Sequence, residues 1–113
     1  PIRRFQAVSF MVADAITKLD AARGVTYLAA RSVDEGAANA RRLVSEAKKF
    51  ATDMAVQRIA DCIQAMGANG LRSDFPLARH LAGAKIAAYT DGSIEMMNER
   101  IGAGLATVFG TPT

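Results

Sequence analysis

The chain of 113 residues has a net charge of +3, one cysteine and no tryptophan, and this length suits a single domain over residues 1–113 without a separate nucleotide-binding sheet domain. Its basic residues lie among acidic ones and are not interleaved with aromatics, which argues against nucleic-acid binding, and one cysteine excludes an internal disulfide and a multi-cysteine metal site. No apolar stretch approaches the ~18 residues of a membrane span and the start does not resemble a signal peptide, so we expect a cytoplasmic protein that holds no metal.

Two long helices are predicted first, over residues 5–34 and 38–66. In both segments apolar residues recur every three or four positions, which is the period of a helix with one buried face. Gly24 is the weak point of the first helix, and Gly36 is a typical stop signal after it. The apolar stripe of the first helix consists of Phe5, Val8, Val12, Ile16, Leu19 and Ala22. The stripe of the second consists of Leu43, Ala47, Phe50, Met54, Ile59, Cys62, Ile63 and Met66. Basic residues, among them Lys48 and Arg58, are expected on the solvated face of the second helix.

Two shorter helices follow a glycine-containing break at residues 67–70. Pro76 favours the start of a third helix over residues 77–82, a connector is predicted over residues 83–91, and a last helix starts near Gly92 and Ser93. No strand pattern is present, so we predict an all-α fold, an antiparallel up-and-down four-helix bundle. The long helices carry more apolar surface than two short ones can cover, which indicates that part of this surface faces another subunit.

The sequence contains no recognisable catalytic triad. His80, the single histidine, is expected at the surface, and Cys62 is expected in the core. Two glycine-containing turns remain, over residues 64–70 and 89–95. The first is either an ordinary helix end or a place where a ligand approaches the backbone. In the second, Asp91 is either a helix cap or a general base, with Gly92 giving a ligand access to backbone N–H groups; spacing alone favours the cap.

The order of several short motifs resembles the acyl-CoA dehydrogenase family over nearly the whole chain. Residues 5–14 read FQAVSFMVAD and resemble the family's FQAv…lAdm helix, and the AK at residues 47–48 resembles the AK of its next helix. Residues 64–70 resemble the Q-x-x-G-G-x-G turn, residues 75–79 resemble yPler, and residues 84–86 resemble the end of DAKI. Asp91, Gly92 and Ser93 stand where the family has EGT. No single motif is decisive, but all of them are collinear.

This resemblance implies a flavin-dependent reaction with FAD as the cofactor. In the family, a carboxylate removes the α-proton of an acyl-CoA thioester, the β-hydrogen leaves as hydride to the flavin N5, and a trans-2-enoyl-CoA forms. Asp91 matches the family's base, and Gly92 matches the glycine beside the substrate thioester. The positions that match FAD-contacting ones are Gln6, Gln64, Gly67, Ala68, Ser93 and Glu95. The turn at residues 64–68 matches one that receives FAD from a neighbouring subunit. Family members are dimers or tetramers that serve fatty acid β-oxidation and usually pass electrons to an electron-transferring flavoprotein.

Three departures from the family pattern keep other functions open. Asp91 is one methylene shorter than the family's Glu, and a displacement of about 1 Å can cost ~10²-fold in rate. Ala68 replaces a glycine of the FAD turn, and residues 82–83 replace the usual Arg-Asp. The family's N-terminal helical and middle β domains are absent from these residues, so the chain alone is expected to be inactive. The alternatives are a non-catalytic helical subunit that supports oligomerisation and shapes a partner's FAD site, and a flavin oxidase similar to nitroalkane oxidases, which use an aspartate base.

Overall fold

The chain folds entirely into helices and turns in the computed structural model, which describes residues 1–110. Its four α-helices are α1 (Gln6–Asp34), α2 (Ala40–Met66), α3 (Leu77–Ala87) and α4 (Ile94–Phe109). Two 3₁₀ segments, η1 (Ile2–Arg4) and η2 (Gly67–Leu71), precede α1 and follow α2. No strand occurs within the described residues, so the all-α, four-helix prediction is confirmed.

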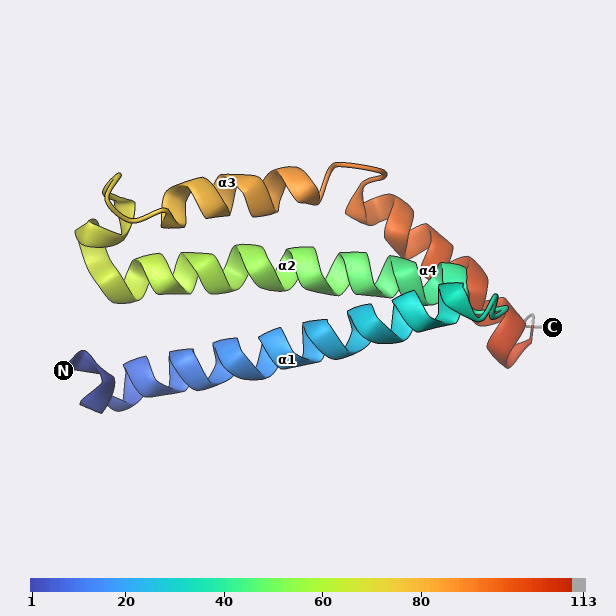
Figure 1. Ribbon diagram of the computed structural model, residues 1–113, viewed down its shortest axis with the longest axis horizontal. Helices are drawn as coiled ribbons and strands as arrows, with labels where there is room; N and C mark the ends of the chain where they lie inside the picture. The colour runs from blue at the N-terminus through green and yellow to red at the C-terminus, as the bar shows by residue number, and fades with distance from the viewer. Residues whose placement is uncertain (111–113) are drawn as a thin grey trace.

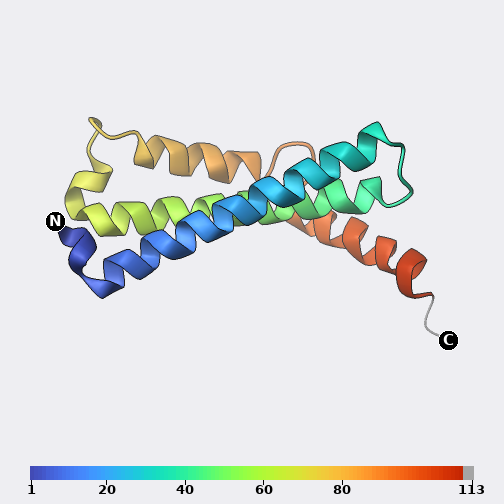
Figure 2. The same ribbon diagram turned by 60° about the horizontal axis from the view of Figure 1, so that its bottom comes forward.

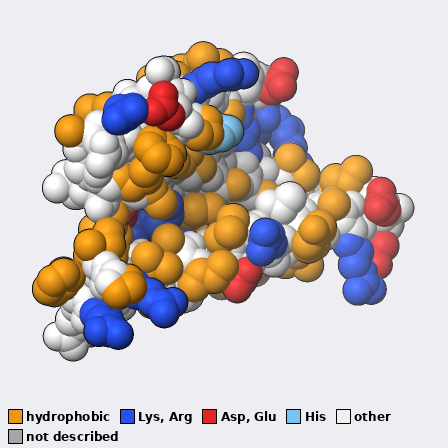
Figure 3. Space-filling model, turned by 60° about the vertical axis from the view of Figure 1, so that its left-hand side comes forward, with side chains coloured by type: hydrophobic (Ala, Val, Ile, Leu, Met, Phe, Trp, Pro, Cys, Tyr) orange, Lys and Arg blue, Asp and Glu red, His pale blue; other side chains and the backbone are white. Residues whose placement is uncertain are grey.

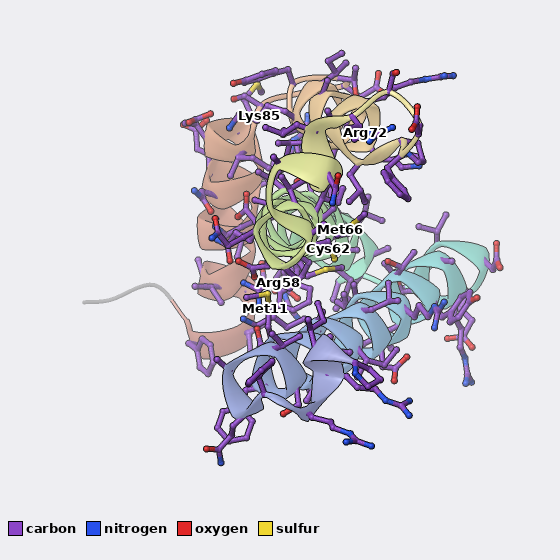
Figure 4. All side chains as sticks on the ribbon, turned by 90° about the vertical axis from the view of Figure 1, so that its left-hand side faces the viewer. Met11, Arg58, Cys62, Met66, Arg72 and Lys85 are labelled. Carbon is purple, nitrogen blue, oxygen red and sulfur yellow. The ribbon has the colours of Figure 1, made fainter. Side chains whose placement is uncertain are left out.

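Helix α2 is the centre of the arrangement. The helices α1, α3 and α4 each pack on α2 and, over residues 1–110, do not approach one another closely. Viewed along α2, they surround it on three sides (Figure 4). The first three helices alternate in direction, whereas α4 crosses α2 obliquely and leads away from the others (Figures 1 and 2). The bundle is therefore open, with little interior of its own.

The hairpin of α1 and α2 is closed by a short glycine turn. Gly36 has a φ of +63°, and its N–H donates to the carbonyl oxygen of Val33 at 3.0 Å, which confirms Gly36 as the stop of the first helix. The buried cluster behind this turn is small: Ala29, Leu43 and Ala47, with Val25 packed against it. Because Ala29 on α1 and Ala47 on α2 are small, the two helices can approach closely here, with Leu43 filling the space beside them.

Arg58 links the two long helices by a charged contact rather than lying in solvent, as the sequence pattern suggested. Its guanidinium donates to the carboxylate of Asp14 on α1 and also pairs with Asp61 at 3.0 Å. Only 18% of the Arg58 side chain is exposed, and it lies beside Met11 between α1 and α2 (Figure 4). The prediction of a solvated face is therefore wrong at Arg58, because the aliphatic stem of an arginine can be buried while its charged end finds a carboxylate.

Only part of the apolar stripe predicted for the first helix faces α2: Ala22 is buried and Val8 is half-buried, but the larger side chains between them lie outside. Phe5, Val12 and Ile16 are 67%, 59% and 51% exposed, whereas the face of α1 turned to α2 carries Ala22, Ala29 and other small residues. The chain exposes 7956 Å² in total, and a compact monomer of 12.0 kDa would expose about 6,000 Å². Hydrophobic side chains cover much of the end where the chain begins (Figure 3). The exposed surface is thus larger than that of a compact monomer and carries many apolar side chains, which is typical of an interaction surface.

Two further expectations from the sequence are wrong. The third helix continues to Ala87 instead of ending at Ala82, so that the predicted connector begins only after it. Gly83 does not stop this helix, because its neighbours Ala82 and Ala84 are strong helix formers that offset its low propensity. Cys62 is exposed rather than buried in a core, since no helix within residues 1–110 covers that part of the surface of α2.

Gly24 gives a direct test of how α1 is stabilised. A Cβ added at Gly24 would meet nothing within 4 Å, and the residue lies in the middle of a helix, where glycine costs about 0.8–1.0 kcal/mol relative to alanine. Gly24→Ala is therefore expected to raise the free energy of unfolding of the chain by up to about 1 kcal/mol, measured by urea denaturation followed by circular dichroism. A loss of stability would show that Gly24 is in contact with another part of the protein.

Candidate functional site

The turn between α3 and α4 carries an acidic residue in an unusual backbone conformation. Asp91 has a φ of +55° and is the only described residue other than glycine with a positive φ. Gly92, which follows it, has a φ of +109°. Aspartate visits the left-handed region more readily than most residues, but such a conformation persists only when its surroundings fix it. The side chain of Asp91 is exposed, so the turn presents a carboxylate at the surface.

Contacts from two helices fix this turn. Lys48 on α2 donates from its ammonium group to the carbonyl oxygens of Thr90 and Gly92, one on either side of Asp91. The hydroxyl of Thr90 donates to the carbonyl oxygen of Ala87 at 3.1 Å. Beneath the turn lies Met97, which is only 2% exposed, and a Cβ added at Gly92 would approach its Cε to 3.0 Å. The φ of Gly92 favours glycine, and a larger residue would also have to displace the end of the Met97 side chain.

Helix α4 is capped by Ser93 and not by Asp91. The hydroxyl oxygen of Ser93 accepts a hydrogen bond from the N–H of Met96 at 3.4 Å. The alternative in which Asp91 only caps the helix is therefore wrong, because the residue two positions later occupies the cap. Glu95 lies in the first turn of α4, and its pKa is lowered by its own backbone N–H, by the hydroxyl of Ser93 and by Lys85 on α3. A carboxylate at the start of a helix is stabilised by the helix dipole as well.

The second turn suggested by the sequence follows α2. Gln64, Gly67 and Ala68 are all exposed there. Gly70 is buried, and a Cβ added to it would lie 2.8 Å from the Cα of Ile63 and 2.9 Å from its carbonyl oxygen. Gly70 cannot be distinguished from Gly67 by sequence pattern, because its close contact with Ile63 depends on how η2 folds back on the last turns of α2.

The structure does not bring all the predicted site residues together. Gln6 and the exposed turn after α2 lie at the same end of the hairpin, where the chain begins (Figures 1 and 2). The Asp91 turn lies beside Lys48, which precedes Gln64 by 16 residues on α2; at 1.5 Å per residue this is about 24 Å along the helix. Within one chain there are therefore two separate groups, one around Asp91 and one around Gln64.

Neither of two grooves on the surface contains Asp91. One, of about 620 Å³, lies between the start of α2 and α4 and is lined by Arg41, Arg42 and Arg100 among others. The other, of about 530 Å³, lies along α2 near Phe50. The carboxylate of Asp91 lines neither of these grooves and is exposed.

Other chemistry finds little support in the described part of the chain. His80 is exposed, as expected. Residues 1–110 contain no group of three His, Cys, Asp or Glu side chains placed to hold a metal ion. None of the helices in this range has the length and hydropathy that a bilayer crossing requires.

The fold and its two exposed turns define an all-α domain built around a long helical hairpin. Residues 1–106 match the family model of the acyl-CoA dehydrogenase C-terminal domain. The chain is 38% identical over 93 residues to cyclohexane-1-carbonyl-CoA dehydrogenase of Geobacter metallireducens, covering 82% of this chain and 24% of that protein. The solved structure of butyryl-CoA dehydrogenase from Megasphaera elsdenii is similar with a TM-score of 0.88 and 32% identity, covering 93% of this chain and 27% of that chain. The FAD complex of PigA is similar with the same TM-score and 28% identity, covering 93% of this chain and 27% of that one.

The chain therefore belongs to the acyl-CoA dehydrogenase family, and it corresponds to the C-terminal domain of that family. It spans about a quarter of the length of the curated relatives that it matches, 24% in the case of the Geobacter protein. The helical fold of the butyryl-CoA dehydrogenase structure agrees with the four helices described above.

Proposed function

We propose that this domain supplies the catalytic base of an FAD-dependent acyl-CoA dehydrogenase, with Asp91 removing the α-proton of the acyl-CoA thioester. The observation that carries the proposal is the conformation of Asp91, an exposed carboxylate in a left-handed turn that α2 fixes from below. Strained residues that the surrounding structure holds in place cluster at active sites. The capping role, which was the other explanation for an acid at this position, belongs to Ser93.

The residues beside Asp91 have roles that follow from their positions. A general base must come within hydrogen-bond reach of the proton it takes, and the exposed carboxylate of Asp91 leaves room for a substrate to approach. Gly92 has no side chain, so the thioester can lie close to its backbone. Bound FAD would supply the acceptor for the β-hydrogen of the substrate, which would leave as a hydride. We further propose that Ser93 and Glu95, at the start of α4, contact this cofactor.

The second group of predicted cofactor residues fits a different FAD molecule. Gln64, Gly67 and Ala68 are exposed and lie about 24 Å from the level of the Asp91 turn, at 1.5 Å rise for each of 16 residues. We propose that these residues and Gln6 contact the FAD of a neighbouring subunit, while Asp91 serves the FAD of its own subunit. The exposed Gln64 amide and the backbone of the turn supply hydrogen-bonding groups suited to a nucleotide. The similarity to the FAD complex of PigA supports FAD as the cofactor.

The excess surface supports a larger assembly. The 7956 Å² that the chain exposes exceeds the area of a compact monomer of this mass by roughly 2,000 Å², and stable interfaces bury areas of this size. We propose that the domain is completed by the family's N-terminal helical and middle β domains and by further copies in a dimer or tetramer. An electron-transferring flavoprotein is the proposed electron acceptor.

Reduction of the flavin by substrate tests the proposed function. The domain, expressed with the segments that complete it and loaded with FAD, is expected to lose its flavin absorbance when an acyl-CoA such as butyryl-CoA is added without oxygen. The 113-residue chain alone is expected to bind no FAD. Bleaching by a nitroalkane in place of any acyl-CoA would instead support a flavin oxidase. If neither class of substrate bleaches the flavin, the result would favour a non-catalytic structural subunit.

A further inference from the structure

We propose that Lys48 is a positioning residue, whose ammonium group fixes the direction in which Asp91 presents its carboxylate. The inference rests on the proposed function of Asp91 as a base. Lys48 lies on α2, 43 residues before Asp91 in the sequence, and it donates hydrogen bonds to the carbonyl oxygens of Thr90 and Gly92. No comparable contact joins any other described side chain of α2 to this turn.

The two hydrogen bonds act on both sides of the same residue. The carbonyl of Thr90 belongs to the peptide unit that contains the N–H of Asp91, and the carbonyl of Gly92 belongs to the unit that follows the next residue. Holding both carbonyls at one ammonium group fixes the peptide unit that precedes Asp91 and the one that follows Gly92, and this limits the direction of the Asp91 Cα–Cβ bond between them. The φ of +55° at Asp91 is the conformation that these two contacts hold, and a left-handed residue other than glycine persists only where the surrounding structure fixes it.

A lysine is suited to this task for three reasons. Its ammonium group has three donors and no acceptor, so it can serve two carbonyls at once. Hydrogen bonds from a charged donor are stronger than those between neutral groups. The Lys48 side chain is half-buried and, within residues 1–110, makes no ion pair that would compete for its charge. Its neighbour Lys49 pairs with Asp53 at 3.8 Å instead.

The experiment compares Lys48→Met with Lys49→Met in the FAD-loaded protein that contains this domain. Lys48→Met removes the charge and the donors but keeps the length of the side chain. It is expected to lower the rate constant of flavin reduction at saturating butyryl-CoA by ~10²-fold, because a displacement of about 1 Å at the reacting group has this effect. The KM is expected to change little. Lys49→Met should reduce flavin at the parent's rate. The rate constant of Lys48→Arg should lie within about tenfold of the parent's, since a guanidinium also offers several donors.

A second measurement does not depend on activity. Nitrogen-15 relaxation of the 113-residue chain is expected to show order parameters at Asp91 and Gly92 that fall from about 0.85 to below about 0.6 in Lys48→Met, and that stay high in Lys49→Met and Lys48→Arg. If Lys48→Met leaves both the order parameters and the reduction rate unchanged while Asp91→Asn is inactive, the inference about Lys48 is overturned. If Lys48→Met does not fold, Lys48→Arg provides the test. A Lys48→Arg variant with a rigid turn but more than tenfold lower activity would also overturn the inference about Lys48.

The two proposals fail in different ways. If Asp91→Asn reduces flavin as fast as the parent, the proposed base is wrong, and a rigid turn held by Lys48 would then have no catalytic purpose. If Asp91→Asn is inactive but Lys48→Met is fully active, the base assignment stands and only the role of Lys48 is refuted.

Discussion

Replacing Asp91 with asparagine is expected to slow flavin reduction by about 10²–10⁴-fold, which is the usual contribution of a general base. The amide of asparagine has nearly the same size as the carboxylate but cannot take the α-proton. The FAD content and the KM for butyryl-CoA should stay close to those of the parent, because Asp91 is exposed and supports neither the cap of α4 nor the core. Anaerobic stopped-flow absorbance measures the rate constant directly.

Two further variants make this prediction specific. Asp74→Asn removes another exposed carboxylate, one that pairs with Arg72 at 2.5 Å in the loop before α3, and it should reduce flavin at the parent's rate. Asp91→Glu moves the carboxylate outward by one methylene and is expected to raise activity if the pocket keeps the dimensions of the rest of the family. Equal rates for Asp91→Asn and the parent would exclude Asp91 as the base.

Gly70→Ala is expected to destabilise the chain by about 2–3 kcal/mol, at the upper end of the usual cost of overpacking. The added Cβ would lie 2.8 Å from the Cα of Ile63 and 2.9 Å from its carbonyl oxygen. Because both atoms belong to the backbone of α2, no side chain can rotate away to relieve the contact. A loss of this size is a large fraction of the free energy of unfolding of a typical domain, which is about 5–15 kcal/mol. Urea denaturation of the chain, followed by circular dichroism, gives the change.

Ala68→Gly is the control for this variant in the same turn. Ala68 is exposed, and restoring the glycine that the family pattern has there should change stability by only a few tenths of a kcal/mol, as surface substitutions usually do. If the proposal for the second FAD site holds, Ala68→Gly should also leave FAD binding intact or improve it. A stable Gly70→Ala variant would mean that η2 does not fold against α2 as described.

The regular part of the fold could be predicted from the sequence because long, periodic segments specify helices strongly. The observed bounds of α1 and α2 differ from the predicted ones by no more than two residues. The face that a helix buries was less predictable. Phe5, Val12 and Ile16 lie at helical spacing and are nevertheless exposed, because periodicity indicates that a helix face is covered but does not identify the partner that covers it. The same limit explains the exposed Cys62.

The candidate site was predictable only in part. The resemblance pointed to Asp91 and Gly92, but spacing alone favoured a cap at Asp91, because acids before a helix usually have that role. Asp91 and Ser93 are two positions apart, just before α4. Which of them caps the helix depends on the backbone conformation of this turn, and the sequence does not show that conformation. The sequence places Lys48 on a solvated face and in a segment that resembles the family's AK, but neither feature predicts a contact with the Asp91 turn. Its contact with the turn spans 42 residues from Thr90 and follows from how α3 and α4 dock on α2.

The central position of α2 keeps the outward face of α1 apart from the turn that carries Asp91. Since α1 packs on one side of α2, and α3 and α4 pack on others without approaching α1, a change in the outward face of α1 has no direct path to the Asp91 turn. If the proposals for Asp91 and for the assembly hold, substitutions on the outward face of α1 can change subunit contacts while the carboxylate of Asp91 keeps its position. This separation arises because α1, α3 and α4 each pack on α2.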